Sequence, residues 1–129
     1  MSFIEFKHIG KKYAGADKNS VSDFNLEINE KEFIAFVGPS GCGKSTTLRM
    51  VAGFEEITEG DLYIDGKKVN ETAPRDRGIA MVFQNYALYP HMTVEKNIGY
   101  GLKNMKMPAD QIKKKVDWAI DILGLQEFR

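Results

Sequence analysis

Residues 38–46 read Gly38-Pro39-Ser40-Gly41-Cys42-Gly43-Lys44-Ser45-Thr46, and they contain the pattern G-x-x-x-x-G-K-[ST] of a phosphate-binding loop. The apolar run at residues 33–37 precedes this loop. Residues 44–52 follow it without a helix breaker, and Gly53 is a suitable residue to end a helix. The sequence therefore predicts a strand, a glycine-rich loop and a helix, which is the order in which such a loop binds phosphate.

The chemistry of this loop predicts a nucleoside triphosphate with Mg²⁺ as its ligand. The glycines allow backbone N–H groups to surround phosphate oxygens, and the N-terminus of the helix adds partial positive charge. Lys44 is placed to reach the β- and γ-phosphates, and the Ser45 hydroxyl to bind Mg²⁺. Because kinases, GTPases and motor ATPases share the loop, it indicates the ligand class and leaves the activity open.

The strand patterns predict an α/β fold with two kinds of sheet. Residues 4–7 and 24–28 alternate apolar and polar side chains, as expected for an antiparallel sheet with one solvated face. Residues 33–37 and 79–83 are continuously apolar, which is typical of parallel strands covered on both faces. In residues 61–69, Asp65-Gly66 separates Asp61-Leu62-Tyr63-Ile64 from Lys67-Lys68-Val69, which predicts a hairpin.

Two further helices are predicted after the second apolar strand. Thr93 is a good N-cap for a helix that begins at Val94. Pro108 opens a longer helix that ends at Gly124, with one apolar face made of Ile112, Val116, Ala119, Ile120 and Leu123. The sequence Asp121-Ile122-Leu123-Gly124 would suit a GTPase if it followed a strand, but its place in the helical period predicts a helix end.

Composition excludes several classes of protein. With 129 residues, the chain is one domain or a piece of one. Its 18 basic and 18 acidic residues leave no net charge, so no nucleic-acid partner is expected. It has no apolar stretch of roughly 20 residues and no signal peptide at its start, so we expect a cytoplasmic protein that touches a membrane only through a partner. Cys42 is the single cysteine, which excludes an internal disulfide.

The segment from Arg75 to Val94, RDRGIAMVFQNYALYPHMTV, resembles the ATP-binding subunits of ATP-binding cassette (ABC) transporters, and above all their carbohydrate-importer branch. The resemblance implies that residues 38–46 are the Walker A segment for ATP and Mg²⁺. It implies that Gln84 is the Q-loop glutamine, a Mg²⁺ ligand that acts with Lys44 in catalysis, and that the ring of Tyr13 stacks on adenine. The residues alone also leave open that Tyr13 is an ordinary edge aromatic and that Gln84 is only the polar end of a strand.

Other motifs of that family are missing from residues 1–129. The Leu-Ser-Gly-Gly-Gln signature, the Walker B aspartate with its adjacent glutamate and the switch histidine do not occur in the sequence. The resemblance therefore implies that residues 1–129 are the N-terminal part of a single ABC-type nucleotide-binding domain. Its expected fold is a P-loop NTPase core fragment, with parallel strands and helices, plus an antiparallel β subdomain and the beginning of a helical subdomain. The full-length protein is expected to be a transport ATPase, whereas this chain alone is not expected to hydrolyse ATP.

The resemblance also implies the partners. It predicts a dimer with a second nucleotide-binding subunit, transmembrane permease subunits that dock near Tyr86–Met92, and a position on the inner face of the cell membrane. The implied activity is solute uptake, with a sugar as the solute. Two alternatives stay open. A soluble kinase or GTPase would share the loop but would not account for Gln84 and Tyr13, and a non-transport cassette protein would need no membrane partner.

Overall fold

The computed structural model describes residues 2–129, which form two compact units. The first unit ends at Met81 and the second covers Val82–Arg129. No helix in the described residues is both long enough and apolar enough to cross a membrane.

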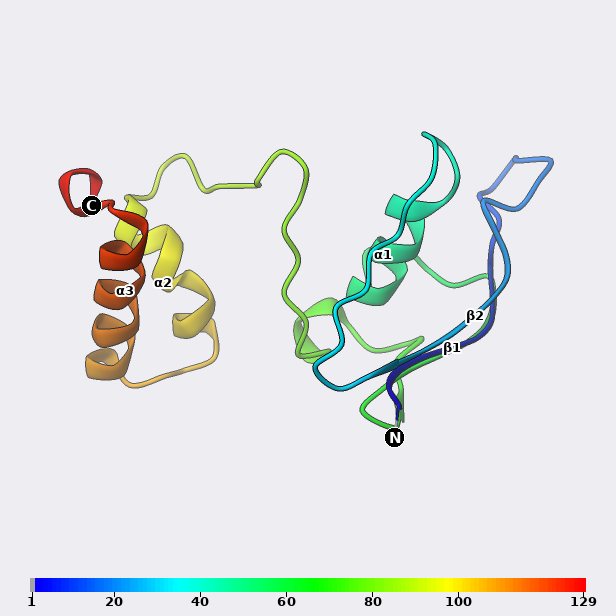
Figure 1. The fold of residues 1–129 in the computed structure, drawn as a ribbon, viewed down its shortest axis with the longest axis horizontal. Coiled ribbons are helices and arrows are strands. Elements are labelled where there is room, and N and C mark those ends of the chain that lie inside the picture. Colours follow the sequence, from blue (N-terminus) through cyan, green and yellow to red (C-terminus); the bar gives the residue numbers. More distant parts are fainter. Residues whose placement is uncertain (1) are drawn as a thin grey trace. The chain divides into compact units, whose positions relative to one another are not determined.

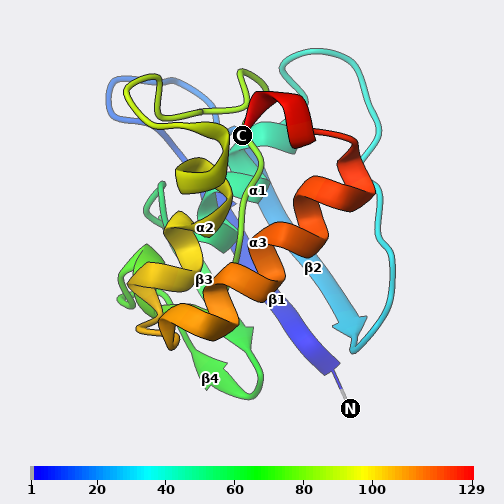
Figure 2. The ribbon, with the colours of Figure 1, turned by 90° about the vertical axis from the view of Figure 1, so that its left-hand side faces the viewer.

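The first unit is built on an antiparallel sheet. Its strands are β1 (Ser2–Lys11), β2 (Val21–Asn29), β3 (Glu59–Ile64) and β4 (Lys67–Lys68), in the order β2-β1-β3-β4 (Figures 1 and 2). The central strand β1 pairs Phe6 with Leu26 on one side and with Leu62 on the other. The predictions of an antiparallel sheet from residues 4–7 and 24–28, and of a hairpin at residues 61–69, are therefore confirmed.

Helix α1 (Lys44–Ala52) packs its apolar side into the core of this unit. Met50 of α1 is 1% exposed and belongs to the same cluster as Phe6 and Leu62 of the sheet. The helix ends at Gly53, whose φ of 90° is a left-handed conformation and whose N–H donates to the carbonyls of Arg49 and Met50. The predicted helix thus has the bounds expected from the sequence.

The second unit contains α2 (Val94–Asn104) and α3 (Ala109–Leu123). The Thr93 hydroxyl accepts a hydrogen bond from the Lys96 N–H at 3.2 Å, so the predicted N-cap is confirmed. Gly99 lets the helices approach closely, because a Cβ at that position would lie 3.3 Å from Val116 Cγ2. Gly124 ends α3 with a φ of 66°, which confirms a helix end at this place.

Short 3₁₀ turns occupy Pro74–Asp76 in the first unit and Gln126–Phe128 in the second.

On α3, Val116 and Ile120 are buried as the apolar face predicts. Leu123, in the last turn, is 64% exposed, so the packed part of that face stops at Ile120.

The predicted parallel strands are wrong for the described chain. Residues 33–37 and 79–83 are irregular, and Phe33, Val37 and Val82 are 94%, 88% and 83% exposed. A strand that is buried on both faces needs hydrogen-bonded neighbours and covering helices. Within residues 2–129 the sheet does not include either segment, and only single side chains such as Phe36, against Phe24, and Ile79, against the core, are partly buried. Gln84 consequently follows an irregular segment and not a buried strand.

Candidate functional site

The glycine-rich loop leads directly into α1 (Figure 1). Gly43 is the N-cap residue of the helix, with a left-handed φ of 94° and no room for a side chain: an added Cβ would lie 2.7 Å from the Ser20 carbonyl oxygen. The glycine therefore gives the loop its turn and lets the β1–β2 connection lie against it.

The tip of the loop is tight and open to solvent. The Cys42 N–H donates to the Pro39 carbonyl at 3.3 Å, and Pro39, Ser40, Gly41 and Cys42 are all exposed. A Cβ at Gly38 would lie 2.7 Å from Cys42 Sγ, whereas one at Gly41 would meet no atom within 4 Å. A side chain at position 38 would therefore collide with Cys42, whereas the space next to Gly41 at the tip of the loop is open.

Lys44 and the hydroxyl residues occupy the first turn of α1. The Lys44 ammonium donates to the Gly38 carbonyl, so the side chain bends back across the loop. Ser45 lies beside it and is exposed, whereas Thr47 is buried. The Thr47 hydroxyl donates to the Gly43 carbonyl at 2.8 Å, which ties the first turn to the N-cap. Lys44 and Ser45 are thus the first two residues of α1, at the N-terminus of the helix.

Tyr13 belongs to the same place, although it lies much earlier in the sequence than the loop. Its hydroxyl is 3.2 Å from the Thr46 hydroxyl in the first turn of α1. The β1–β2 connection also contacts the phosphate loop at Gly43, where an added Cβ would lie 2.7 Å from the Ser20 carbonyl oxygen. The β1–β2 connection therefore brings the Tyr13 ring to the N-terminus of α1. In the sequence, only the family resemblance predicts this position of the ring.

The residues of the loop fit a bound triphosphate with Mg²⁺. A helix N-terminus offers backbone N–H groups and partial positive charge to an anion. Lys44 adds a full positive charge, and Ser45 adds the hydroxyl that a hard cation accepts as a ligand. The open space above Gly41 leaves room for phosphate oxygens next to the loop. The site is built to hold and neutralise an anion.

Gln84 belongs to the second unit, whereas the phosphate loop belongs to the first. It is exposed and stands at the start of a turn over residues 84–87. Its role beside Ser45 in a magnesium site stays a prediction.

The loop of residues 86–92, which we call the docking loop, is exposed at one end and anchored at the other. Tyr86 and Leu88 are 74% and 71% exposed. Tyr89 is partly covered, with its ring centroid 4.6 Å from that of Tyr100, and this partial desolvation raises the pKa of its hydroxyl. The loop thus presents two large apolar side chains from a fixed base.

Asn97, which the sequence interpretation missed, provides most of this anchoring. Its side-chain oxygen accepts from the Tyr89 N–H at 2.9 Å, and its amide donates to the carbonyls of Tyr89, Met92 and Thr93. Asn is unfavourable in the interior of a helix, so an Asn in the first turns of α2 was a usable signal of such a role.

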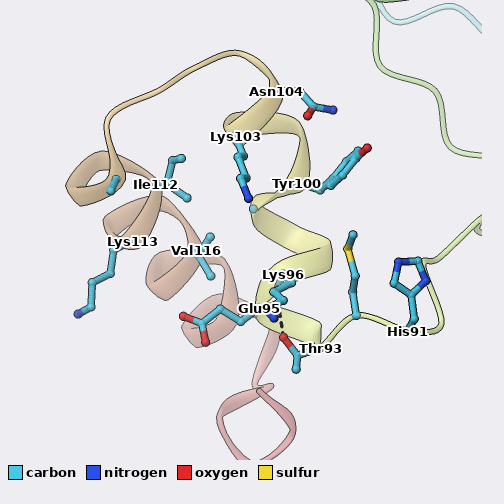
Figure 3. Close-up of a pocket in the computed structure, with 13 residues that line it drawn as sticks. His91, Thr93, Glu95, Lys96, Tyr100, Lys103, Asn104, Ile112, Lys113 and Val116 are labelled. Carbon is cyan, nitrogen blue, oxygen red and sulfur yellow. Dashed lines mark hydrogen bonds between the residues drawn. The ribbon is translucent and has the colours of Figure 1, made fainter.

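A groove of about 930 Å³ lies in the second unit beside the docking loop. Its lining includes His91 and Met92 from the loop, Tyr100 from α2, and Ile112 and Val116 from α3. Figure 3 shows Ile112 and Val116 directed toward α2. The groove combines apolar walls with the lysines of α2, so it is suited to an amphipathic segment.

Arg77 is a second residue that the sequence interpretation passed over. It is 8% exposed, and its guanidinium donates to the carbonyls of Met50 and Val51 at the end of α1 and to that of Thr72. Burial lowers the pKa of this guanidinium. Arg77 thus caps the C-terminal end of the helix whose N-terminus forms the phosphate site.

Comparison with known proteins gives a consistent result. The sequence profile of the ABC transporter family matches residues 21–129. The chain is 64% identical over 128 residues to the oligosaccharides import ATP-binding protein MsmX of Bacillus subtilis (strain 168), covering 99% of this chain and 35% of that protein. It is 61% identical to the multiple sugar-binding transport ATP-binding protein MsmK of Streptococcus mutans serotype c (strain ATCC 700610 / UA159), covering 97% and 33%. The chain spans about a third of the length of these curated relatives.

A solved structure shares the fold. The dimeric ATP-binding cassette MJ0796, in a post-hydrolysis state bound to ADP and Pi, matches with a TM-score of 0.82 at 30% identity, covering 97% of this chain and 59% of that one. This likeness confirms the predicted P-loop fold class, although residues 33–37 and 79–83 form no parallel strands in the described chain.

Proposed function

Since the chain belongs to the ABC transporter family, we propose that it binds ATP with Mg²⁺ as the N-terminal part of a transport ATPase. The observation that carries this proposal is the junction of Gly43 and α1, where a cation, a hydroxyl and a helix N-terminus converge on an open loop. Few arrangements other than an anion site account for all three.

Each site residue has a defined part in the proposed complex. Lys44 binds the β- and γ-phosphate oxygens, and the backbone N–H groups of residues 38–46 surround the phosphates. Ser45 and Gln84 provide oxygen ligands for Mg²⁺, which, when bound, neutralises charge on the phosphates. Tyr13 offers its ring to the adenine base, supported by the position of its hydroxyl at Thr46.

We propose that residues 1–129 are the N-terminal part of one ABC-type nucleotide-binding domain in a longer subunit. The coverage of about a third of the curated relatives supports this. The sequence also contains no Walker B carboxylate pair, which the family uses to bind Mg²⁺ and to activate water. The longer subunit hydrolyses ATP, and this chain by itself binds nucleotide without turnover.

The work that hydrolysis drives is proposed to be sugar import. The relatives are named for oligosaccharides import and for multiple sugar-binding transport, at 64% and 61% identity. The whole subunit then pairs with a second nucleotide-binding subunit and lies on the inner face of the cell membrane, against permease subunits. The dimeric state of MJ0796 supports the pairing.

The docking loop is the proposed contact with those permease subunits. Exposed Tyr86 and Leu88 provide apolar area, and Asn97 holds the base of the loop on α2. Aromatic residues and methionine are enriched where proteins dock, and the loop begins two residues after Gln84. In this proposal a short segment links a γ-phosphate ligand to the membrane partner.

Transport in vesicles tests this function. The full-length protein is reconstituted with its permease subunits, and ATP-dependent sugar uptake is measured for the wild type and for Leu88→Ser. Leu88 is suitable because it is 71% exposed, so its replacement should leave ATP binding unchanged while reducing assembly or uptake. Lys18→Ala, at an exposed position of the first unit, is the control. Uptake by Leu88→Ser at the control rate would remove the docking proposal and favour a non-transport cassette protein.

A further inference from the structure

Lys11 is a buried cation beside Tyr13. It is the last residue of β1, it is 8% exposed, and its carbonyl accepts from the Ser20 N–H at 2.7 Å. Burying an ammonium is unfavourable unless other groups compensate for the lost hydration. A lysine at the end of a strand could extend into water, so its burial points to specific partners.

Two partners hold the ammonium of Lys11. Glu55 Oε2 lies 3.6 Å from Lys11 Nζ, and Glu55 follows shortly after the end of α1. The same nitrogen lies over the ring of Tyr13, 5.0 Å from its centroid, which is within the range of a cation–π interaction. Lys11 therefore connects the end of the phosphate-site helix to the aromatic ring.

Tyr13 is consequently held at two points. Its hydroxyl meets Thr46 at 3.2 Å, and the Lys11 ammonium occupies one face of its ring. A base that stacks on this ring would therefore take the face opposite Lys11. An aromatic side chain that is already ordered also loses less conformational entropy when a ligand binds.

We propose that Lys11 is a positioning residue for the nucleobase: it covers one face of the Tyr13 ring and, through Glu55, fixes the other face toward the ligand. The proposal rests on the proposed ATP-binding function, because it gives Tyr13 a base to stack on. Lys11 acts on the base part of the nucleotide and leaves the binding of the phosphates unchanged.

Calorimetric titration of the full-length protein with two ligands separates these effects. ATP·Mg²⁺ carries the base, and inorganic tripolyphosphate with Mg²⁺ carries only the phosphates. In Lys11→Met, which keeps an unbranched stem, we expect ATP affinity to fall about fivefold while tripolyphosphate affinity changes by less than about twofold. Lys11→Arg keeps a cation for the ring and should retain more ATP affinity than Lys11→Met.

A double variant completes the test. In Tyr13→Ala the ring is absent, so adding Lys11→Met should cause no further loss of ATP affinity. Equal losses for both ligands in Lys11→Met, no loss for ATP, or additive losses in the double variant would each overturn the proposal. If Lys11→Met does not fold, Glu55→Gln loosens the same lysine and should give the same selective loss for ATP. A wild type that binds tripolyphosphate as tightly as ATP would instead refute the stacking role of Tyr13 in the proposed function.

Discussion

Replacing Arg77 by methionine should destabilise the first unit strongly, although Arg77 does not belong to the proposed nucleotide site. The side chain is buried, and its guanidinium makes three hydrogen bonds: to Met50 O at 2.8 Å, to Val51 O at 3.1 Å and to Thr72 O at 2.9 Å. Methionine has an unbranched apolar stem and no donor. The substitution therefore removes the hydrogen bonds while keeping much of the packing.

The magnitude follows from these contacts. A hydrogen bond that involves a charged group contributes about 1.5–3 kcal/mol, and the loss of partners for buried carbonyls is unfavourable. Two effects reduce the sum. The Met50 carbonyl keeps the N–H of Gly53, at 3.3 Å, and the new side chain in Arg77→Met buries no charge. We expect the free energy of unfolding to fall by about 2–4 kcal/mol.

Urea denaturation followed by circular dichroism measures this loss. Arg75→Met is the matched control, because the Arg75 side chain is 87% exposed and its ion pair with Asp76 is 3.9 Å long. An exposed pair of this kind contributes about 0–1 kcal/mol. Hydrogen exchange at the Gly53 and Phe54 amides, which bond to the carbonyls of the last turn of α1, should accelerate in Arg77→Met. If Arg77→Met lost no more stability than Arg75→Met, the capping role of Arg77 would be refuted.

Three further predictions concern the loops and the activity. Cys42 is exposed at the phosphate loop, so iodoacetamide should alkylate it readily and ATP·Mg²⁺ should slow the reaction; equal rates with and without ATP would contradict the site. Asn97→Ala removes the anchors of the docking loop, and hydrogen exchange at the Tyr89 amide should accelerate while α1 is unaffected; an unchanged Tyr89 rate would refute the anchoring. Purified residues 1–129 should release no phosphate from ATP, and turnover free of contaminants would show that the missing carboxylates are not needed.

Local signals in the sequence were sufficient for the helices. Gly53, Thr93 and Gly124 each set a helix boundary through a contact or a dihedral angle of their own, so their effect does not depend on distant residues. The same holds for the Asp65-Gly66 turn between β3 and β4. Such boundaries are predictable from a single sequence.

Signals that depend on distant partners were less informative. The apolar run at residues 33–37 indicates side chains that favour burial. A buried strand forms only where neighbouring strands and helices cover it. In the described chain Phe33 and Val37 are exposed. The contacts of Lys11 with Glu55 and of Arg77 with Met50 join residues far apart in the sequence. No periodicity or spacing encodes such pairs, so only the structure reveals them.

Calorimetric titration of the full-length protein with ATP·Mg²⁺ tests whether Lys44 binds the phosphates, by comparing the wild type with Lys44→Ala and with the control Lys18→Ala. The Lys44 ammonium extends across the loop to Gly38, and its loss removes a charge-assisted contact with the phosphates. We predict saturable binding by the wild type and the control, and an affinity about 10- to 100-fold weaker for Lys44→Ala. Equal affinity of Lys44→Ala and the wild type for ATP·Mg²⁺ would contradict this prediction.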